Sequence, residues 1–151
     1  MTRTKPAQFS AECSVGRLVE ARLCWMNDAG DVQRFLEQMR RAFKVAGDSV
    51  ICADWRGAVV FPPSVGDALL ELLRQGNRHF IRSAILLPSE DAIFSLQVER
   101  LCREASNPAR RTFRDVKPFL AWLQETLTPL EGARAVEFIS QGLRLPRPET
   151  A

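Results

Sequence analysis

The chain has 151 residues, of which 46% are hydrophobic and 26% are charged. A fold of this size buries about 68–70% of its unfolded surface, so one domain with its own core is expected without disulfides or metals. No apolar run approaches the roughly 20 residues that cross a bilayer, and the first residues lack the apolar core of a secretion signal. We therefore expect a cytoplasmic protein with no membrane partner.

The net charge of +3 comes from 21 basic residues interleaved with 18 acidic ones. The densest basic groups are only Arg40-Arg41 and Arg110-Arg111 with one further cation each. Nucleic-acid-binding domains concentrate their basic residues on one face or in one run. The distribution here predicts solvated surfaces and no nucleic-acid partner.

The four cysteines show no CxxC spacing, and the single histidine, His79, follows a predicted helix end. A zinc site needs ligands that converge, and cysteine–histidine catalysis needs a paired base. The sequence also lacks a phosphate-binding glycine loop and a GxSxG elbow. These observations predict buried, unreactive thiols, no metal, no cofactor and no enzymatic activity.

The first third of the chain predicts a hairpin and a helix. After about eight residues expected to be disordered, residues 9–15 and 18–26 alternate apolar and polar side chains around a Gly16-Arg17 turn. The turn and N-cap residues Asn27, Asp28, Gly30 and Asp31 follow, and apolar side chains at helical spacing then predict a helix that ends at Gly47.

The stretch 49–73 predicts the centre of the fold. Residues 50–55 are apolar or small apart from Asp54, as in a strand that is covered on both faces. The sequence positions no basic partner for Asp54, so we expect a structural role at the strand end. Beyond Pro62-Pro63, Ser64 is a candidate N-cap of a second helix, with Asp67 at N3.

The second half predicts two further strand–helix pairs. Residues 81–87 form a second inner strand, and Ser89 or Asp91 caps the helix that follows. Residues 110–114 predict a short edge strand because only one of them is strongly apolar. Asp115 caps the next helix, whose buried stripe is expected to be Phe119, Leu120, Leu123 and Leu127, with Trp122 at the rim.

A last helix is predicted at 128–142, since Thr128, Pro129 and Glu131 form a capping box with proline at the first helical position. The alternation of elements favours the α/β class, with a mixed sheet of about five strands and four main helices plus a short C-terminal helix. The expected divisions of the chain are a disordered N-terminus at 1–8, one domain at 9–127, a C-terminal helical extension at 128–142 and a flexible tail at 143–151.

Residues 9–127 resemble a STAS-type domain, the fold of bacterial anti-sigma factor antagonists, and in particular its divergent SpoIIAA-like branch of bacterial proteins. The resemblance is carried by VICADWRG at 50–57, VGDALL at 65–70, and RRTFRD at 110–115 followed by FLAWL at 119–123. It implies a STAS-like mixed sheet. Family members include phosphorylated switch proteins, stressosome parts and transporter tails.

In the switch proteins an Asp-Ser-Ser-Gly motif opens the helix and a kinase modifies its second serine, which Ser64 matches. Pro62, Pro63 and Val65 replace the other three residues, so the kinase-recognition motif is degenerate. Capping alone explains a serine at this position. Ser64 is therefore a possible phosphosite, with helix capping the preferred interpretation.

Two functions remain open. The first is a non-catalytic regulatory module that docks a protein partner, a regulator or kinase-like protein, through the 57–67 loop and the neighbouring faces of the second and third helices. The contact residues expected there are Arg56, Gly57, Pro62, Pro63, Ser64, Val65, Gly66 and Asp67. The alternative is a small-ligand or lipid-binding module with an apolar pocket between sheet and helices. A homodimer through the edge strand or the last helix is also possible.

Overall fold

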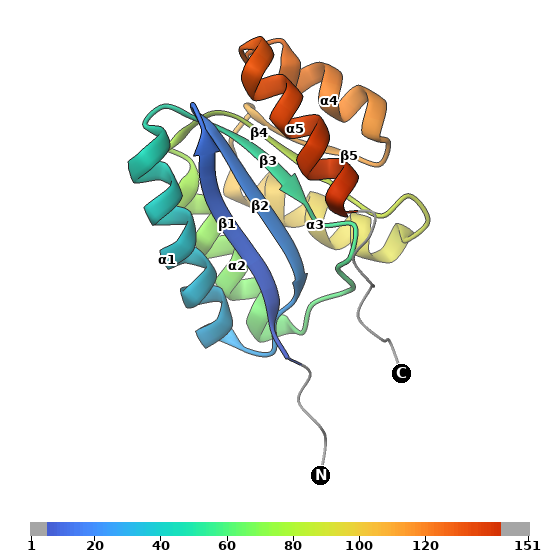
Figure 1. Ribbon diagram of the computed structural model, residues 1–151. Helices are drawn as coiled ribbons and strands as arrows, with labels where there is room; N and C mark the ends of the chain where they lie inside the picture. The colour runs from blue at the N-terminus through green and yellow to red at the C-terminus, as the bar shows by residue number, and fades with distance from the viewer. Residues whose placement is uncertain (1–5, 143–151) are drawn as a thin grey trace.

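The computed structural model describes residues 6–142, and in this range five strands form one sheet that five helices cover (Figure 1). The strands are β1 (Gln8–Val15), β2 (Leu18–Trp25), β3 (Ser49–Asp54), β4 (Phe80–Leu86) and β5 (Arg110–Phe113). The helices are α1 (Ala29–Ala46), α2 (Pro63–Gly76), α3 (Ala92–Ala105), α4 (Val116–Gln124) and α5 (Pro129–Gly142). The predicted α/β class and mixed sheet are confirmed.

The strands lie in the order β1-β2-β3-β4-β5, so β1 and β5 are the edges. β1 and β2 form an antiparallel hairpin, and every later neighbour pairs in parallel. β3 therefore lies in the middle of the sheet, and all six of its residues are buried. This burial on both faces explains the nearly uninterrupted run of apolar and small residues in β3.

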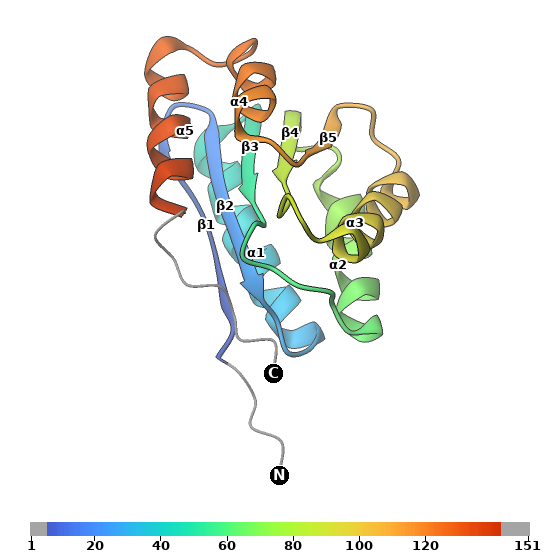
Figure 2. The same ribbon diagram turned by 90° about the vertical axis from the view of Figure 1, so that its right-hand side faces the viewer.

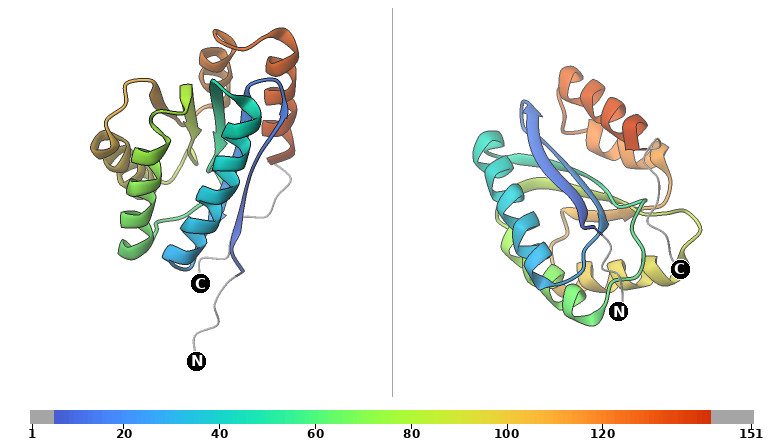
Figure 3. Two further views of the ribbon diagram at one scale, coloured as in Figure 1. Left: turned by 90° about the vertical axis from the view of Figure 1, so that its left-hand side faces the viewer. Right: turned by 60° about the horizontal axis from the view of Figure 1, so that its bottom comes forward.

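The helices form two layers, with α1, α2 and α3 on one face of the sheet and α4 and α5 on the other (Figures 2 and 3). Alternate residues of each strand face the two layers. Toward α1–α3 they form the larger core, which includes Val19, Leu23, Ile51, Ala53 and Ile85. Toward α4 and α5 they form a second core, which includes Leu18, Val50, Cys52, Ala84 and Leu86.

Three helices begin with side-chain caps that the sequence predicted. Asp28 accepts a hydrogen bond from the Asp31 N–H at 2.9 Å, and Asp91 accepts one from the Phe94 N–H at 3.0 Å. At α5, Thr128 Oγ1 accepts from the Glu131 N–H at 3.2 Å while Glu131 Oε1 accepts from the Thr128 N–H at 2.9 Å. This reciprocal pair is the predicted capping box.

The N-cap role predicted for Ser64 is wrong. Helix α2 begins two residues earlier than this N-cap predicts, at Pro63, with Pro62 in the N-cap position and no side-chain cap. The fixed backbone of a proline suits the first helical position, where the missing N–H is not needed. Ser64 is therefore the second residue of the helix, and it is exposed.

The buried face of α4 also differs from the prediction. Trp122 is only 8% exposed, whereas Leu120 and Leu127 are half-buried. The Trp122 ring lies 5.7 Å from that of Phe113, and the guanidinium groups of Arg82 and Arg111 lie within 5 Å of it. The large ring is therefore enclosed by strand side chains, and the smaller leucines lie at the edge of the buried face of α4.

The expected disorder at 1–8 overlaps β1, which starts at Gln8, and residues 1–5 lie outside the described range. The predicted tail at 143–151 also lies outside it. Between residues 6 and 142, no helix is both long enough and apolar enough to cross a bilayer.

Candidate functional site

The loop between β3 and α2 is fastened to α3. The Gln97 side chain binds the backbone of Phe61 twice, because its Oε1 accepts from the Phe61 N–H at 2.9 Å and its Nε2 donates to the Phe61 carbonyl at 3.0 Å. The Phe61 ring is buried and makes edge contacts with Trp55 and Phe94. Polar and apolar anchors at the same residue hold this loop in one conformation.

The structure divides the predicted contact residues by exposure. Pro63, Ser64 and Asp67 are exposed, whereas Arg56, Gly57 and Pro62 are half-buried. Val65 and Gly66 are buried, and Val65 belongs to the core under α1–α3. These two residues position the helix and present no surface to a partner.

Exposed apolar side chains that were not predicted as contacts lie beside this loop. Val60 is 44% exposed, Ile93 72% and Leu96 62%. Val60 precedes the clamped Phe61, and on α3 Leu96 precedes Gln97 while Ile93 lies one turn before it. We call Val60, Ile93 and Leu96, with Pro63, Ser64 and Asp67, the loop–α3 surface. The helical spacing of Ile93 and Leu96 outside the buried stripe was the sequence signal for it.

The N-terminus of α2 lies at the margin of this surface. The first helical hydrogen bond runs from the Gly66 N–H to the Pro62 carbonyl at 2.9 Å, so the N–H groups of Ser64 and Val65 precede it. Backbone N–H groups at a helix start favour a nearby negative charge. A phosphate on Ser64 would meet this positive end and also the exposed carboxylate of Asp67, one turn further along.

Asp54 does have basic partners, contrary to the sequence-based expectation. It is buried, and Arg56 binds it through Nε and Nη2, each at 3.0 Å, while Arg22 Nε lies 3.6 Å away. The same two arginines donate to the last turn of α5, Arg22 to the Phe138 carbonyl at 2.8 Å and Arg56 to the Ile139 carbonyl at 2.7 Å. This cluster fastens α5 to the carboxyl ends of β2 and β3, so its role is structural, as expected.

Arg22 could not be assigned from sequence because both of its contacts are set by the tertiary fold, whereas Arg56 binds Asp54 from two residues away and depends on the fold only for its contact with α5. Arg22 lies opposite Asp54 in the β2–β3 register, and α5 supplies carbonyls from more than 80 residues away. Opposite charges on paired strand positions would have been the available signal.

Burial disfavours the thiolate form of all four cysteines. Burial raises the pKa of Cys102 to about 11, and it also raises the pKa values of Cys13, Cys24 and Cys52 above their ordinary range. No group of three potential metal ligands gathers anywhere in residues 6–142. His79 is exposed in its loop, and its ring stacks on Phe43 at 4.9 Å.

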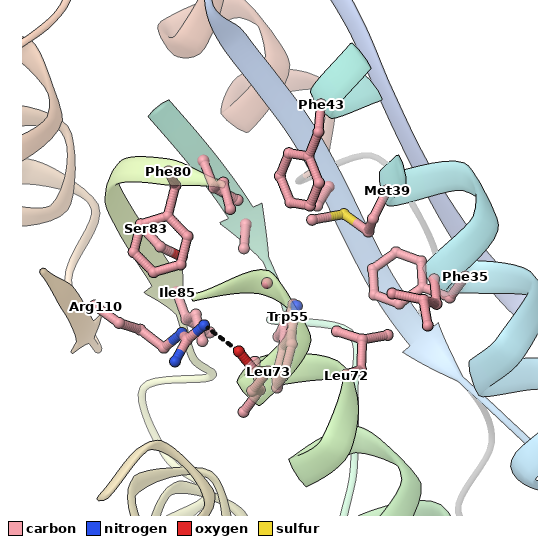
Figure 4. Close-up of a pocket in the computed structure, with 15 residues that line it drawn as sticks. Phe35, Met39, Phe43, Trp55, Leu72, Leu73, Phe80, Ser83, Ile85 and Arg110 are labelled. Carbon is pink, nitrogen blue, oxygen red and sulfur yellow. Dashed lines mark hydrogen bonds between the residues drawn. The ribbon is translucent and has the colours of Figure 1, made fainter. Parts of the chain in front are cut away.

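A cavity of about 40 Å³ lies between the sheet and helices α1 and α2 (Figure 4). Its lining is almost wholly apolar, but the side chain of Arg110 reaches it from β5. Arg110 is only 8% exposed, although the sequence placed it on an exposed edge strand. The strand does lie at the edge, but its first residue points under α2. In a strand of only four residues, the sequence pattern does not indicate that Arg110 is buried.

No family model matches the chain, and the search of curated proteins returned no match either.

Proposed function

We propose that the protein is a non-catalytic regulatory module that docks a protein partner through the loop–α3 surface. The observation that carries the proposal is the double hydrogen bond of Gln97 to Phe61, next to exposed Val60, Ile93 and Leu96. A fixed loop loses little conformational entropy on binding, and exposed apolar side chains beside it supply the contact energy. The STAS-type resemblance, which remains a prediction, adds a family in which such domains act as regulatory parts.

The partner we propose carries an apolar segment flanked by basic residues. Asp67 is exposed in the first turns of α2, and Glu90 is exposed immediately before the cap of α3. These carboxylates lie at the margin of the apolar side chains and would attract a cationic rim. A kinase-like partner bound to this surface would also contact Ser64. We therefore include phosphorylation of Ser64 in the proposal, as the switch that controls docking.

Two matched substitutions test this surface. Leu96 and Leu130 are both exposed on helices, at 62% and 73%, and Leu130 lies in the first turn of α5, where its neighbours belong to another part of the molecule. We expect Leu96→Asp to lower recovery of the partner by at least fivefold in cross-linking and affinity capture from the native host, because one buried anchor often contributes more than 1 kcal/mol to binding. Leu130→Asp should leave recovery unchanged.

Equal recovery with both variants would contradict the proposed surface. Intact-mass measurements of protein from several growth phases test the switch in parallel, since persistent absence of a phosphate at Ser64 argues against it. The compartment we propose is the cytoplasm, supported by four free cysteines, which are typical of a reducing environment. A homodimer through edge strand β5 or helix α5 stays a prediction.

The cavity gives some support to the alternative of a ligand-binding module. An apolar cavity between sheet and helices is present where that function requires one. Its volume of about 40 Å³ is far below the 300–1,000 Å³ of pockets for drug-sized ligands. A lipid chain does not fit it, so any ligand must be small.

A further inference from the structure

The cavity under α1 and α2 has room for a few non-hydrogen atoms. One water needs about 10–15 Å³ of such volume, so about 40 Å³ corresponds to roughly three waters. Hydrocarbon surrounds most of it, from Phe35, Met39, Phe43, Leu72, Ile85 and Phe80 (Figure 4). A wholly apolar space of this kind would normally stay empty.

Arg110 brings a buried positive charge to this otherwise largely apolar cavity. Its Nη2 donates to the Leu73 carbonyl at 3.0 Å, and its guanidinium lies 5.0 Å from the centre of the Phe80 ring. Its Nε and Nη1 are buried and have no hydrogen-bond partner, and it has no ion pair within the described residues. A buried cation without a counter-charge is costly, since one carbonyl does not replace its hydration.

The guanidinium keeps its charge in this setting. Burial lowers the pKa of Arg110 from its ordinary value, but an arginine starts so high that it stays protonated in proteins. The Cys102 thiol interacts electrostatically with Arg110, but burial raises its pKa to about 11, so it supplies no negative charge near neutral pH. The missing partner of Arg110 is therefore an anion.

Trp55, another residue of the cavity wall, carries a second unpartnered donor. The indole Nε1 of Trp55 is buried without a hydrogen-bond partner, and the Trp55 ring forms part of the wall opposite α1. Buried polar groups in folded proteins nearly always find partners, so two such donors around one cavity point to an absent acceptor.

A positively charged surface groove lies beside Arg110. This groove runs between the end of α3 and β5, and Arg110 lines both the groove and the cavity. Arg103 and Arg111 also line the groove, against one acid, Glu99. Its excess of positive charge attracts small anions.

We propose that this cavity binds a small aliphatic monocarboxylate of two to four carbons, with its carboxylate on the free N–H groups of Arg110 and its short tail among the apolar side chains of α1 and α2. Charge-assisted hydrogen bonds from arginine to a carboxylate are the strong ones available here. Arg110 is the one charged residue among those that line the cavity, so a second negative charge would stay unpaired, which excludes dicarboxylates and doubly charged phosphate. The size of the cavity excludes longer chains.

A titration series tests this assignment on the full chain. Acetate, propionate, butyrate and octanoate are compared with propionamide, at constant ionic strength, by calorimetry and by the NMR signal of the Trp55 indole N–H. We expect saturable binding that is strongest for propionate or butyrate, a shifted indole signal, and affinity for propionamide at least tenfold weaker because it carries no charge. Equal binding of the amide, or affinity that increases through octanoate, would overturn the proposal.

Two variants locate the site. Arg110→Met keeps a similar length without the charge and should weaken propionate binding at least tenfold, while circular dichroism reports whether the fold persists. Ala53→Val, in the wall on β3, fills the space with Arg110 intact and should abolish binding as well. Propionate that binds both variants as it binds the parent protein, or that shows no saturable binding to the parent, would overturn the inference.

Discussion

The two faces of the sheet differ in whether their buried charges are paired. On the face under α4 and α5, Glu20 is 1% exposed and Arg134 binds both of its carboxylate oxygens, at 2.7 and 3.0 Å. Asp54 on the same face is held by Arg56 and Arg22. On the face under α1–α3, Arg110 is buried with no counter-charge. Paired charges fasten one layer to the sheet, whereas the unpaired one is available to a ligand.

The largest expected effect comes from breaking a paired charge. Arg134→Met leaves the Glu20 carboxylate buried without its arginine, and removing one partner of a buried pair costs about 3–5 kcal/mol. Urea denaturation measures the loss. The double variant Glu20→Gln with Arg134→Met should recover part of it, and a single variant as stable as the parent would show that the pair does not hold α5.

Gly16→Ala tests the turn below α5 and should cost about 2–3 kcal/mol. Gly16 has φ of +53°, which costs other residues about 1–2 kcal/mol, and a Cβ there would overlap the Glu131 carboxylate. Gly16→Ala in a Glu131→Ala background is the matched control, because that truncation removes the side-chain atoms that the added Cβ would overlap and keeps the backbone conformation of the turn. Equal losses of stability in thermal unfolding would mean that the overlap with Glu131 adds nothing to the cost of Gly16→Ala.

Acid should weaken the α5 face through Glu131. Burial raises the pKa of Glu131, but hydrogen bonds from the Arg17 and Thr128 N–H groups outweigh it, and the pKa lies below its ordinary value of 4.5. Its contribution is therefore complete above about pH 4.5 and is lost as the pH falls through the lower folded value. Glu131→Gln should cost about 1–2 kcal/mol at pH 7, as the loss of a good cap does.

The difference between Glu131→Gln and the parent protein should shrink as acid protonates the parent carboxylate. Free energies of unfolding measured in urea between pH 3 and pH 7 give this curve. A difference that stays constant over the whole range would contradict the role of the ionised carboxylate.

The smallest expected effect is at the start of α2. Ser64→Asp places a negative charge in the first turn of a helix that has no side-chain cap, which should raise stability by about 0.3–1 kcal/mol. Ser64→Asn is the uncharged control in the same thermal unfolding assay. If Ser64→Asp lowers stability and Ser64→Asn does not, repulsion by Asp67 outweighs the attraction between the new carboxylate and the positive end of the helix.

Local patterns predicted most of the fold. The caps at Asp28, Asp91 and Thr128 and the buried run in β3 follow from residues close in sequence, and the structure confirms them. The N-cap of α2 was predicted two residues too late, at Ser64, because two adjacent prolines compete for the helix start.

The contacts of the candidate sites depend on distant residues, so the sequence did not predict them. Gln97 meets Phe61 across 36 positions, and Arg110 meets the Leu73 carbonyl across 37. Asp54 meets Arg22 only through the strand register. Periodicity reports which face of an element is buried, but it does not report which polar groups meet there.

The difference between the faces is tested most directly by the unfolding free energies of Arg110→Met and Arg134→Met, measured side by side in urea without added carboxylate. An apolar side chain in place of an uncompensated buried charge is neutral or stabilising, so we predict that Arg110→Met stays within about 1 kcal/mol of the parent or exceeds it, while Arg134→Met loses about 3–5 kcal/mol. Equal losses in the two variants would contradict the claim that Arg110 is a buried charge without a counter-charge.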